Sequence, residues 1–240
     1  CGRNPKDVDV SNVNVNVVIS RFDRDIFSIS PDSIPFKMQS LYAEYGNFFD
    51  LFCTRIINIG PPSQPSTGTY LTGFVTDFDI QKVANDCDKN FSDLRTLNNE
   101  LTMAFKRYKY FFPDKVIPRV ITFISGFNFS IITADSILGI GIDMYLGKNY
   151  PTYQSLAFPE YKRMTMEPQC IAIDAVKGWL MSEFQPDVSN RDLINAMIYY
   201  GKIYYCSETL FPDVKDSLIA GYSTRQDEWC NKNEAHAWAF

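Results

Sequence analysis

The sequence predicts an α+β fold, in which one predominantly helical domain contains a small antiparallel or mixed β-sheet. Two observations support this fold class. Apolar residues recur at helical spacing over most of the chain, while β-branched residues gather in one internal stretch at 119–144. The resulting order of strand, helices, strand cluster and helices favours α+β over a doubly wound parallel sheet. With 240 residues, 45% of them apolar, the chain can form one core, which we place in a single domain at 13–240.

The N-terminal half is expected to contain one strand followed by helices. Apolar and polar residues alternate from about residue 13, as is typical of a half-buried strand. The apolar members are Val13, Val15, Val17 and Ile19. Helical spacing then predicts a helix within 33–57, followed by the clearest loop at 61–68. Further helices are expected near 72–90 and at 92–111, the second with Ser92 as its N-cap.

The C-terminal half is expected to begin with strands and end with helices. β-branched and aromatic residues dominate three short runs, which we interpret as antiparallel strands near 119–125, 128–133 and 137–144. Helical spacing returns at 155–165, 167–184 and 189–210. Ser189 or Asn190 is the expected cap of the last helix.

Charge and composition exclude several functional classes. The net charge of −5 argues against a protein that neutralises nucleic-acid phosphates, so no nucleic acid is expected as a partner. The local basic cluster of Lys106, Arg107 and Lys109 fits a solvated helix face. No apolar run approaches the roughly 20 residues of a membrane-spanning helix. The cysteines lack the spacing of a zinc ribbon.

The first residues are typical of a mature bacterial lipoprotein. Such proteins begin, after removal of a signal peptide, with a cysteine that carries acyl chains and is followed by a polar tether. Here Cys1 precedes Gly2 and several polar residues, so we expect a lipidated tether at 1–12. Because Gly2 is not the aspartate that retains many lipoproteins at the inner membrane, we expect anchoring at the outer membrane, facing the periplasm or the cell surface. An arbitrary chain boundary at Cys1 is the alternative.

The glycine-rich segment at 136–154 does not match a phosphate-binding loop. A dinucleotide loop needs a third glycine after Gly139 and Gly141, but Met144 occupies that position and no helix start follows. Gly147 and Lys148 also lack the remainder of a P-loop. We therefore expect these glycines to allow close backbone approach, or a bulge, within a sheet, and no cofactor is predicted.

Five collinear blocks resemble the gliding motility lipoprotein GldB family of Bacteroidetes. They are ISGFNFSIIT at 124–133, IGIDMYLGKNYPTY at 140–153, FPEYKRM at 158–164, AMIYYGKIYY at 196–205 and GYSTRQDEWCNKNEAHAW at 221–238. The resemblance implies a lipoprotein needed for gliding and for its associated secretion machinery. It also implies a family domain that continues, with more helix, beyond Phe240.

That family in turn resembles predicted zinc proteases of the zincin type. In zincins an H-E-x-x-H helix supplies two histidine ligands and a catalytic glutamate, and a later helix supplies a third ligand. The register of the resemblance places Ile173, Asp174 and Lys177 at the first three positions, and Tyr200, just before Gly201, at the last. Isoleucine has no donor atom and a lysine ammonium repels a metal ion. The resemblance thus implies a degenerate zincin-like architecture.

The remaining residues do not suggest catalysis. His236 is the only histidine, so neither a histidine-based zinc site nor a Ser/His/Asp triad is expected. We expect a non-enzyme without metal, which scaffolds or binds an envelope protein partner and uses Asp143, Tyr145 and Gly201 for structure or binding. One alternative is a hydrolase with an unconventional site of Asp143, Asp174, Glu234 and His236. Another is a lipoprotein that captures glycans on exposed Tyr and Trp side chains.

Overall fold

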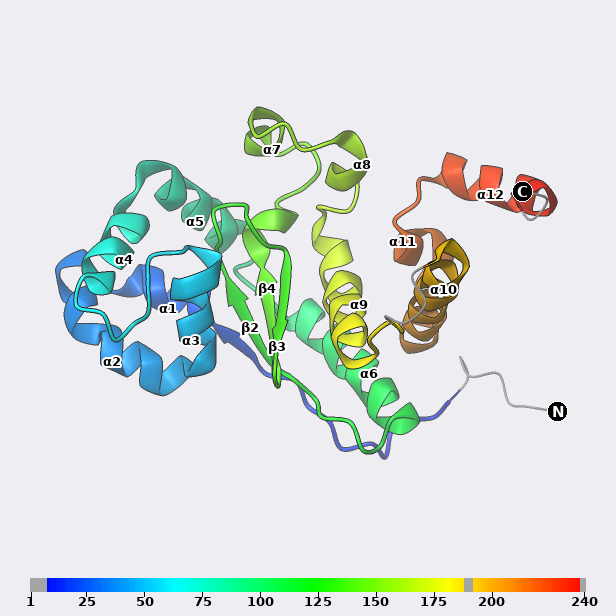
Figure 1. Cartoon of the computed structure of the whole chain (residues 1–240), viewed down its shortest axis with the longest axis horizontal. Coiled ribbons are helices and arrows are strands. Elements are labelled where there is room, and N and C mark those ends of the chain that lie inside the picture. The colour runs from blue at the N-terminus through cyan, green and yellow to red at the C-terminus, as the bar shows by residue number, and fades with distance from the viewer. Residues whose placement is uncertain (1–7, 188–191, 238–240) are drawn as a thin grey trace.

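A four-stranded mixed β-sheet forms the centre of the molecule in the computed structural model, which describes residues 8–187 and 192–237 (Figure 1). The strands are β1 (Ile19–Arg21), β2 (Arg119–Phe123), β3 (Ile131–Ala134) and β4 (Ile137–Gly141). Their order in the sheet is β1-β2-β4-β3. The α+β class with a small mixed sheet among helices is therefore confirmed.

The direction of the strands differs in part from the antiparallel pairing expected above. Only β3 and β4 are antiparallel, whereas β2 is parallel to both β1 and β4. The connections explain the difference. The tight turn at Asp135 and Ser136 reverses the chain between β3 and β4, while the longer segment at 124–130 carries it past the position that β4 occupies.

The strand expected from residue 13 was wrong except at its end, because only Ile19–Arg21 pairs in the sheet. The alternation at 13–19 does follow burial, and Val17 is only 3% exposed. Its backbone amide, however, donates to the Thr102 hydroxyl at 3.1 Å. Apolar alternation here reflects packing against a helix and not a β-ladder.

The N-terminal helices are shorter than their apolar patterns suggested. They are α1 (Phe22–Ser28), η2 (Pro31–Ser33), α2 (Ile34–Tyr45), α3 (Asn47–Leu51), the π-helical turn η3 (Phe52–Ile56), α4 (Thr67–Thr76), α5 (Phe78–Asn90) and α6 (Arg95–Phe111). Gly46, with φ of 54°, separates α2 from α3. Asp77 caps α5 by accepting the amides of Asp79 and Ile80, so the expected 72–90 helix is two helices. Ser92 is not the cap of α6, because Leu94 is the N-cap and has no side-chain capping bond, while the Asp93 carboxylate accepts the Arg95 amide.

The C-terminal part is helical, as expected. Its elements are η4 (Ile142–Tyr145), α7 (Pro151–Ser155), α8 (Glu160–Arg163), η5 (Pro168–Cys170), α9 (Ile171–Glu183), α10 (Leu193–Leu210), α11 (Asp216–Ala220) and α12 (Thr224–Ala237). The expected 155–165 helix is interrupted, because Ala157 has φ of 55° and Pro159 follows. Helix α10 has Asp192 as its N-cap, while the expected caps Ser189 and Asn190 lie outside the described residues.

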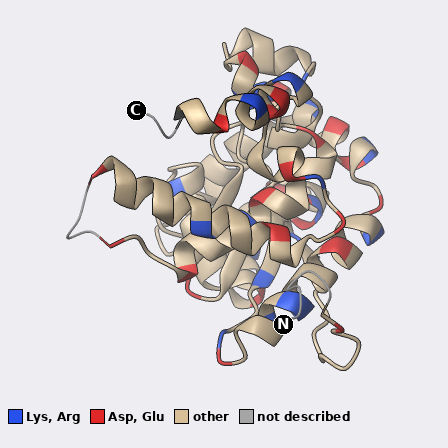
Figure 2. Ribbon diagram, turned by 90° about the vertical axis from the view of Figure 1, so that its right-hand side faces the viewer, with Lys and Arg blue, Asp and Glu red and all other residues tan. Residues whose placement is uncertain are grey.

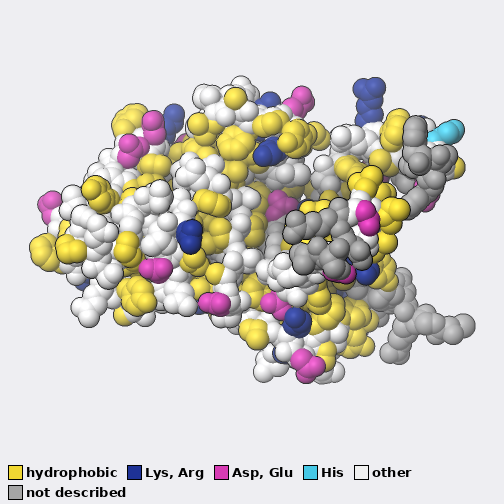
Figure 3. Space-filling view, in the orientation of Figure 1, with side chains coloured by type: hydrophobic (Ala, Val, Ile, Leu, Met, Phe, Trp, Pro, Cys, Tyr) yellow, Lys and Arg dark blue, Asp and Glu magenta, His cyan; other side chains and the backbone are white. Residues whose placement is uncertain are grey.

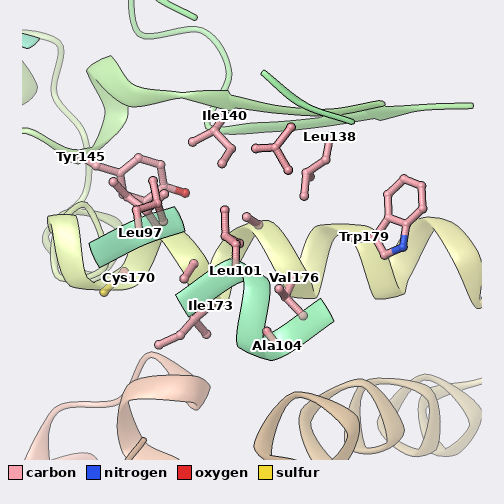
Figure 4. Packing of buried hydrophobic residues seen from close by; sticks show 14 of the residues in the cluster. Leu97, Leu101, Ala104, Leu138, Ile140, Tyr145, Cys170, Ile173, Val176 and Trp179 are labelled. Carbon is pink, nitrogen blue, oxygen red and sulfur yellow. The ribbon is translucent and has the colours of Figure 1, made fainter. Parts of the chain in front are cut away.

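Hydrophobic clusters cover both faces of the sheet. Helices α1 to α4 lie on one face, where Phe22 packs against Phe52 with ring centroids 4.7 Å apart. Helices α6 and α9 lie on the other, and Figure 4 shows Leu138 and Ile140 pointing from the sheet toward them. In the described part of the chain, no helix is both long and apolar enough to cross a membrane.

Candidate functional site

The glycines of β4 allow the backbone to approach its neighbours closely. A side chain at Gly139 would place its Cβ 2.5 Å from the Ile132 side chain. A Cβ at Gly141 would lie 2.0 Å from the Phe129 carbonyl oxygen, which is far inside van der Waals contact. The prediction that these glycines serve sheet packing is therefore confirmed.

Asp143 organises the loop that follows β2. Its side chain is fully buried and accepts the Phe127 amide at 2.7 Å and the Ser125 amide and hydroxyl at 3.1 Å. Burial raises the pKa of Asp143 to about 6, although these hydrogen bonds lower it. The loop needs such an anchor because Gly126 and Phe127 both have positive φ, at 68° and 66°.

A second polar network joins η4 to α9. Tyr145, only 1% exposed, donates its hydroxyl to Asp174 Oδ2 at 3.2 Å. Lys177 Nζ lies 3.1 Å from Asp174 Oδ1 and donates to the Ile219 carbonyl at 3.0 Å. Burial raises the pKa of Asp174, against the lowering effect of Lys177. Sequence reasoning singled out all three side chains, but only the fold brings Tyr145 to the other two.

A pocket of about 310 Å³ opens beside this network. Tyr145 and Asp174 line it together with residues from the loop after β2 and from the segment around α8. Its apolar lining consists of Phe127, Met144, Phe158 and Met166, and further polar lining comes from Asn128, Ser130, Lys162 and Thr165. This mixture of apolar walls and a few convergent polar groups is characteristic of small-molecule sites.

The zincin register does not produce a zinc site. Ile173 is 2% exposed and packs in the core, so the first ligand position has no donor atom (Figure 4). Lys177 pairs with Asp174, and Tyr200 is 48% exposed on α10. The residues present therefore do not fit a zinc ion held by this register.

The residues of the alternative hydrolase site are not assembled. Asp143 and Asp174 have separate hydrogen-bond partners, while Glu234 and His236 are exposed on α12. Among residues 8–187 and 192–237, no group of three His, Cys, Asp or Glu side chains could hold a metal ion. The cysteines in these ranges are all free.

The surface of α10 is the feature that sequence reasoning missed. Leu193, Ile194 and Ile198 are 75%, 68% and 50% exposed, and Tyr205 is 58% exposed. A hollow of about 1040 Å³ lies between α10 and the residues that follow α9, and Ile198, Gly201 and Tyr205 are among the residues that line it. Figure 2 shows α10 drawn mostly in tan, with few acidic or basic residues along it, and Figure 3 shows hydrophobic side chains at many places on the face of the molecule seen in Figure 1. The signal in the sequence was a helix that is apolar all around.

The fold and these two sites define a small, mostly helical α+β protein with a mixed pocket and an apolar helix surface. The chain belongs to the gliding motility protein GldB family, whose family model matches residues 3–240. It is therefore a membrane-associated lipoprotein of gliding motility, and the resemblance to this family is confirmed. Comparisons with curated proteins and with solved structures gave no match, so the zincin-type architecture stays a prediction.

Proposed function

We propose that this lipoprotein is a non-catalytic component of the gliding and secretion machinery and binds another envelope protein through α10. The observation that carries the proposal is the exposed apolar face of α10 beside a large hollow. Soluble domains rarely leave such a surface uncovered, and contiguous apolar patches mark interaction sites. The exposed aromatic residues Tyr200 and Tyr205 are of the type that dominates binding energy at protein interfaces.

The partner that fits this surface is an apolar helix of an envelope protein. A hollow bordered by one long helix accepts a second amphipathic helix through side chains spaced one turn apart. Ile198 and Tyr205, both exposed and both lining the hollow, supply contacts for it along α10. The non-catalytic part of the proposal rests on Ile173 and Lys177, neither of which serves as a zinc ligand at its position in the register.

The surface is tested in gliding cells with a photo-crosslinking residue at Tyr205 and a second substitution, Ile198→Glu. We expect one specific cross-linked partner, loss of this product in the Ile198→Glu variant, and loss of gliding. The matched control is Phe78→Glu, since Phe78 is 82% exposed on α5, outside this surface. An undiminished cross-link in Ile198→Glu, or equal losses in both variants, would contradict the proposal.

We further propose that lipid on Cys1 anchors the domain at the outer membrane. Cys1 lies outside the described residues, so the support comes from the sequence and from the lipoprotein family. Two acyl signals are needed for stable membrane attachment. The test is a Cys1→Ala variant behind a working signal peptide, which should move to the soluble periplasmic fraction. A variant that stays with the outer membrane refutes the anchor.

The other two functions considered from the sequence have weaker support. The hydrolase requires Asp143, Asp174, Glu234 and His236 to meet, and within the part of the chain that the structure describes no hydrogen bond or ion pair joins any two of them. Metal analysis of the purified protein tests it, and stoichiometric zinc or iron would contradict the non-catalytic proposal. Glycan capture is favoured by one observation, the exposed ring of Trp229 at 62%. Glycan-array binding that Trp229→Ala abolishes would support it.

A further inference from the structure

We propose that the 310 Å³ pocket beside Tyr145 and Asp174 binds a small zwitterion, an apolar α-amino acid or a dipeptide of such residues. The pocket lies at the small end of the range of ligand sites, about 300–1,000 Å³. It is distinct from the hollow beside α10, with which it shares no lining residue. The proposal is therefore independent of partner binding.

The lining of the pocket offers a carboxylate for the ammonium group of the ligand. Asp174 receives one hydrogen bond from Tyr145 and one ion pair from Lys177. A carboxylate has about four acceptor positions, so two remain for a ligand. Lys177 also donates to the Ile219 carbonyl and does not line the pocket. Lys177 thus holds Asp174 in place without occupying the site.

The mouth of the pocket offers a cation for the carboxylate of the ligand. Lys162 lines the pocket, is exposed, and has no ion pair or side-chain hydrogen bond with any residue in the described ranges. Tyr145 and Met166, by contrast, are 1% and 5% exposed and mark the deep end. The pocket therefore presents one carboxylate and one ammonium among its lining residues, which matches a ligand with an ammonium at one end and a carboxylate at the other.

The walls between the two charges favour an apolar side chain. Phe127, Met144, Phe158 and Met166 contribute rings and thioethers, which adapt to apolar groups of different shape. The wall at Phe127 is held in place, because the Phe127 amide donates to buried Asp143. The ring of Phe158 packs edge-on against Tyr153, with centroids 6.0 Å apart. A pre-formed wall reduces the entropy lost on binding.

The test is calorimetric titration of the purified protein with L-leucine, L-phenylalanine and the dipeptide Leu-Leu. We expect at least one of them to bind. Lys162→Gln should weaken its binding by about tenfold or more, which is the effect of one charge-assisted hydrogen bond. The matched control is Lys37→Gln, because Lys37 is an exposed lysine of α2 outside the pocket. Lys162 is exposed, so the variant is expected to fold.

Modified ligands assign each charge to its partner. N-acetyl-leucine lacks the ammonium and leucinamide lacks the carboxylate, so each should bind more weakly than the parent amino acid. Asp174→Asn should weaken leucine and leave N-acetyl-leucine unchanged, while Lys162→Gln should leave leucinamide unchanged. Absence of binding by every probe at millimolar concentration overturns the proposal, as does equal loss in Lys162→Gln and Lys37→Gln.

Discussion

Asp143 supports the loop at 124–130 by accepting hydrogen bonds, and its replacement should show how much of this support needs a charge. In Asp143→Ala, the buried amide of Ser125 and the partly buried amide of Phe127 lose their acceptor. Each unpaired buried group costs about 1–3 kcal/mol, so the two together should lower the free energy of unfolding by about 2–6 kcal/mol. This is a large part of the roughly 5–15 kcal/mol that stabilises a domain.

Asp143→Asn should lower the free energy of unfolding far less than Asp143→Ala. Three hydrogen bonds, from the Ser125 amide and hydroxyl and the Phe127 amide, converge on Oδ2. The amide oxygen of asparagine can take this place and accept all three. These hydrogen bonds are weaker when the acceptor carries no charge. The variant, however, also avoids the free-energy cost of burying a carboxylate, and burial has a larger effect on the pKa of Asp143 than the hydrogen bonds have. We therefore expect a change within about 1 kcal/mol at pH 7.

The pH dependence separates the two contributions. Burial raises the pKa of Asp143 in the folded protein to about 6 from 3.8. At a pH between these two pKa values, Asp143 is protonated in the folded state and ionised in the unfolded state. Wild-type stability should therefore fall by about 3 kcal/mol from this group as pH rises from about 4 to 6, and stay at the lower level above it. In Asp143→Asn this component should be absent.

Urea unfolding followed by circular dichroism at pH 4, 5, 6 and 7 measures all three proteins. Asp79→Asn is the matched control, because Asp79 is exposed on α5. The reasoning is refuted if Asp143→Asn is as unstable as Asp143→Ala. It is also refuted if Asp143→Asn keeps the wild-type fall in stability between pH 4 and 6.

Three further substitutions, two of them with a matched control variant, test the packing and the second network by the same unfolding assay. Gly141→Ala should destabilise the protein by about 3 kcal/mol or more, because the new Cβ would lie 2.0 Å from the Phe129 carbonyl oxygen. The control is Gly73→Ala, which has no neighbour within 4 Å and should stabilise helix α4 by about 0.5–1 kcal/mol. Equal effects would contradict the close approach. Phe22→Ala should lower the free energy of unfolding by about 3–5 kcal/mol, since Phe22 is fully buried among four rings. Its control is Phe36→Ala, at an 85% exposed site, which should lower it by less than about 0.5 kcal/mol. Lys177→Met removes the cation beside Asp174, so the pKa of that carboxyl should rise further. The loss in the free energy of unfolding should then grow as pH rises. A loss that does not depend on pH would show that Lys177 acts only by packing.

Helices were largely predictable because their signals are local. The stripe of α6 includes Leu101, Ala104 and Phe105, and all three are buried as the helical spacing indicates. The errors arose where a single residue interrupts a continuous apolar pattern. Gly46 breaks one expected helix by its positive φ, and Asp77 caps the start of another. Such interruptions depend on backbone geometry, to which apolar periodicity is insensitive.

Strand direction was less predictable, because pairing joins distant segments. Ile19 pairs with Val120, about a hundred positions later in the chain, and no local pattern specifies that partner. The apolar runs at 119–144 correctly indicated strands there. They did not show that β4 lies between β2 and β3, which makes the β2–β4 pair parallel. Apolar alternation sets the face that a residue occupies, but not the neighbour of a strand.

For the two candidate sites, too, some features could be predicted from the sequence and others could not. The acidic residues Asp143 and Asp174 stood out in the sequence, and the absence of histidine ligands at Ile173 and Lys177 could be established there. The pairing of Tyr145 with Asp174, 29 positions apart, appeared only in the structure. The exposure of α10 was also unpredictable, since an apolar helix is equally consistent with a buried one.

Residue identity and local periodicity were enough to predict the family, the α+β class and the chemical types available to a site. The folded chain was needed to show which polar groups meet, which strands are parallel and which apolar face stays uncovered. The physical reason is that burial and hydrogen bonding are shared properties of segments brought together by the fold. Asp143 is an example. The sequence shows that an acidic residue stands at this position, but its role as a hydrogen-bond acceptor depends on the loop that folds around it.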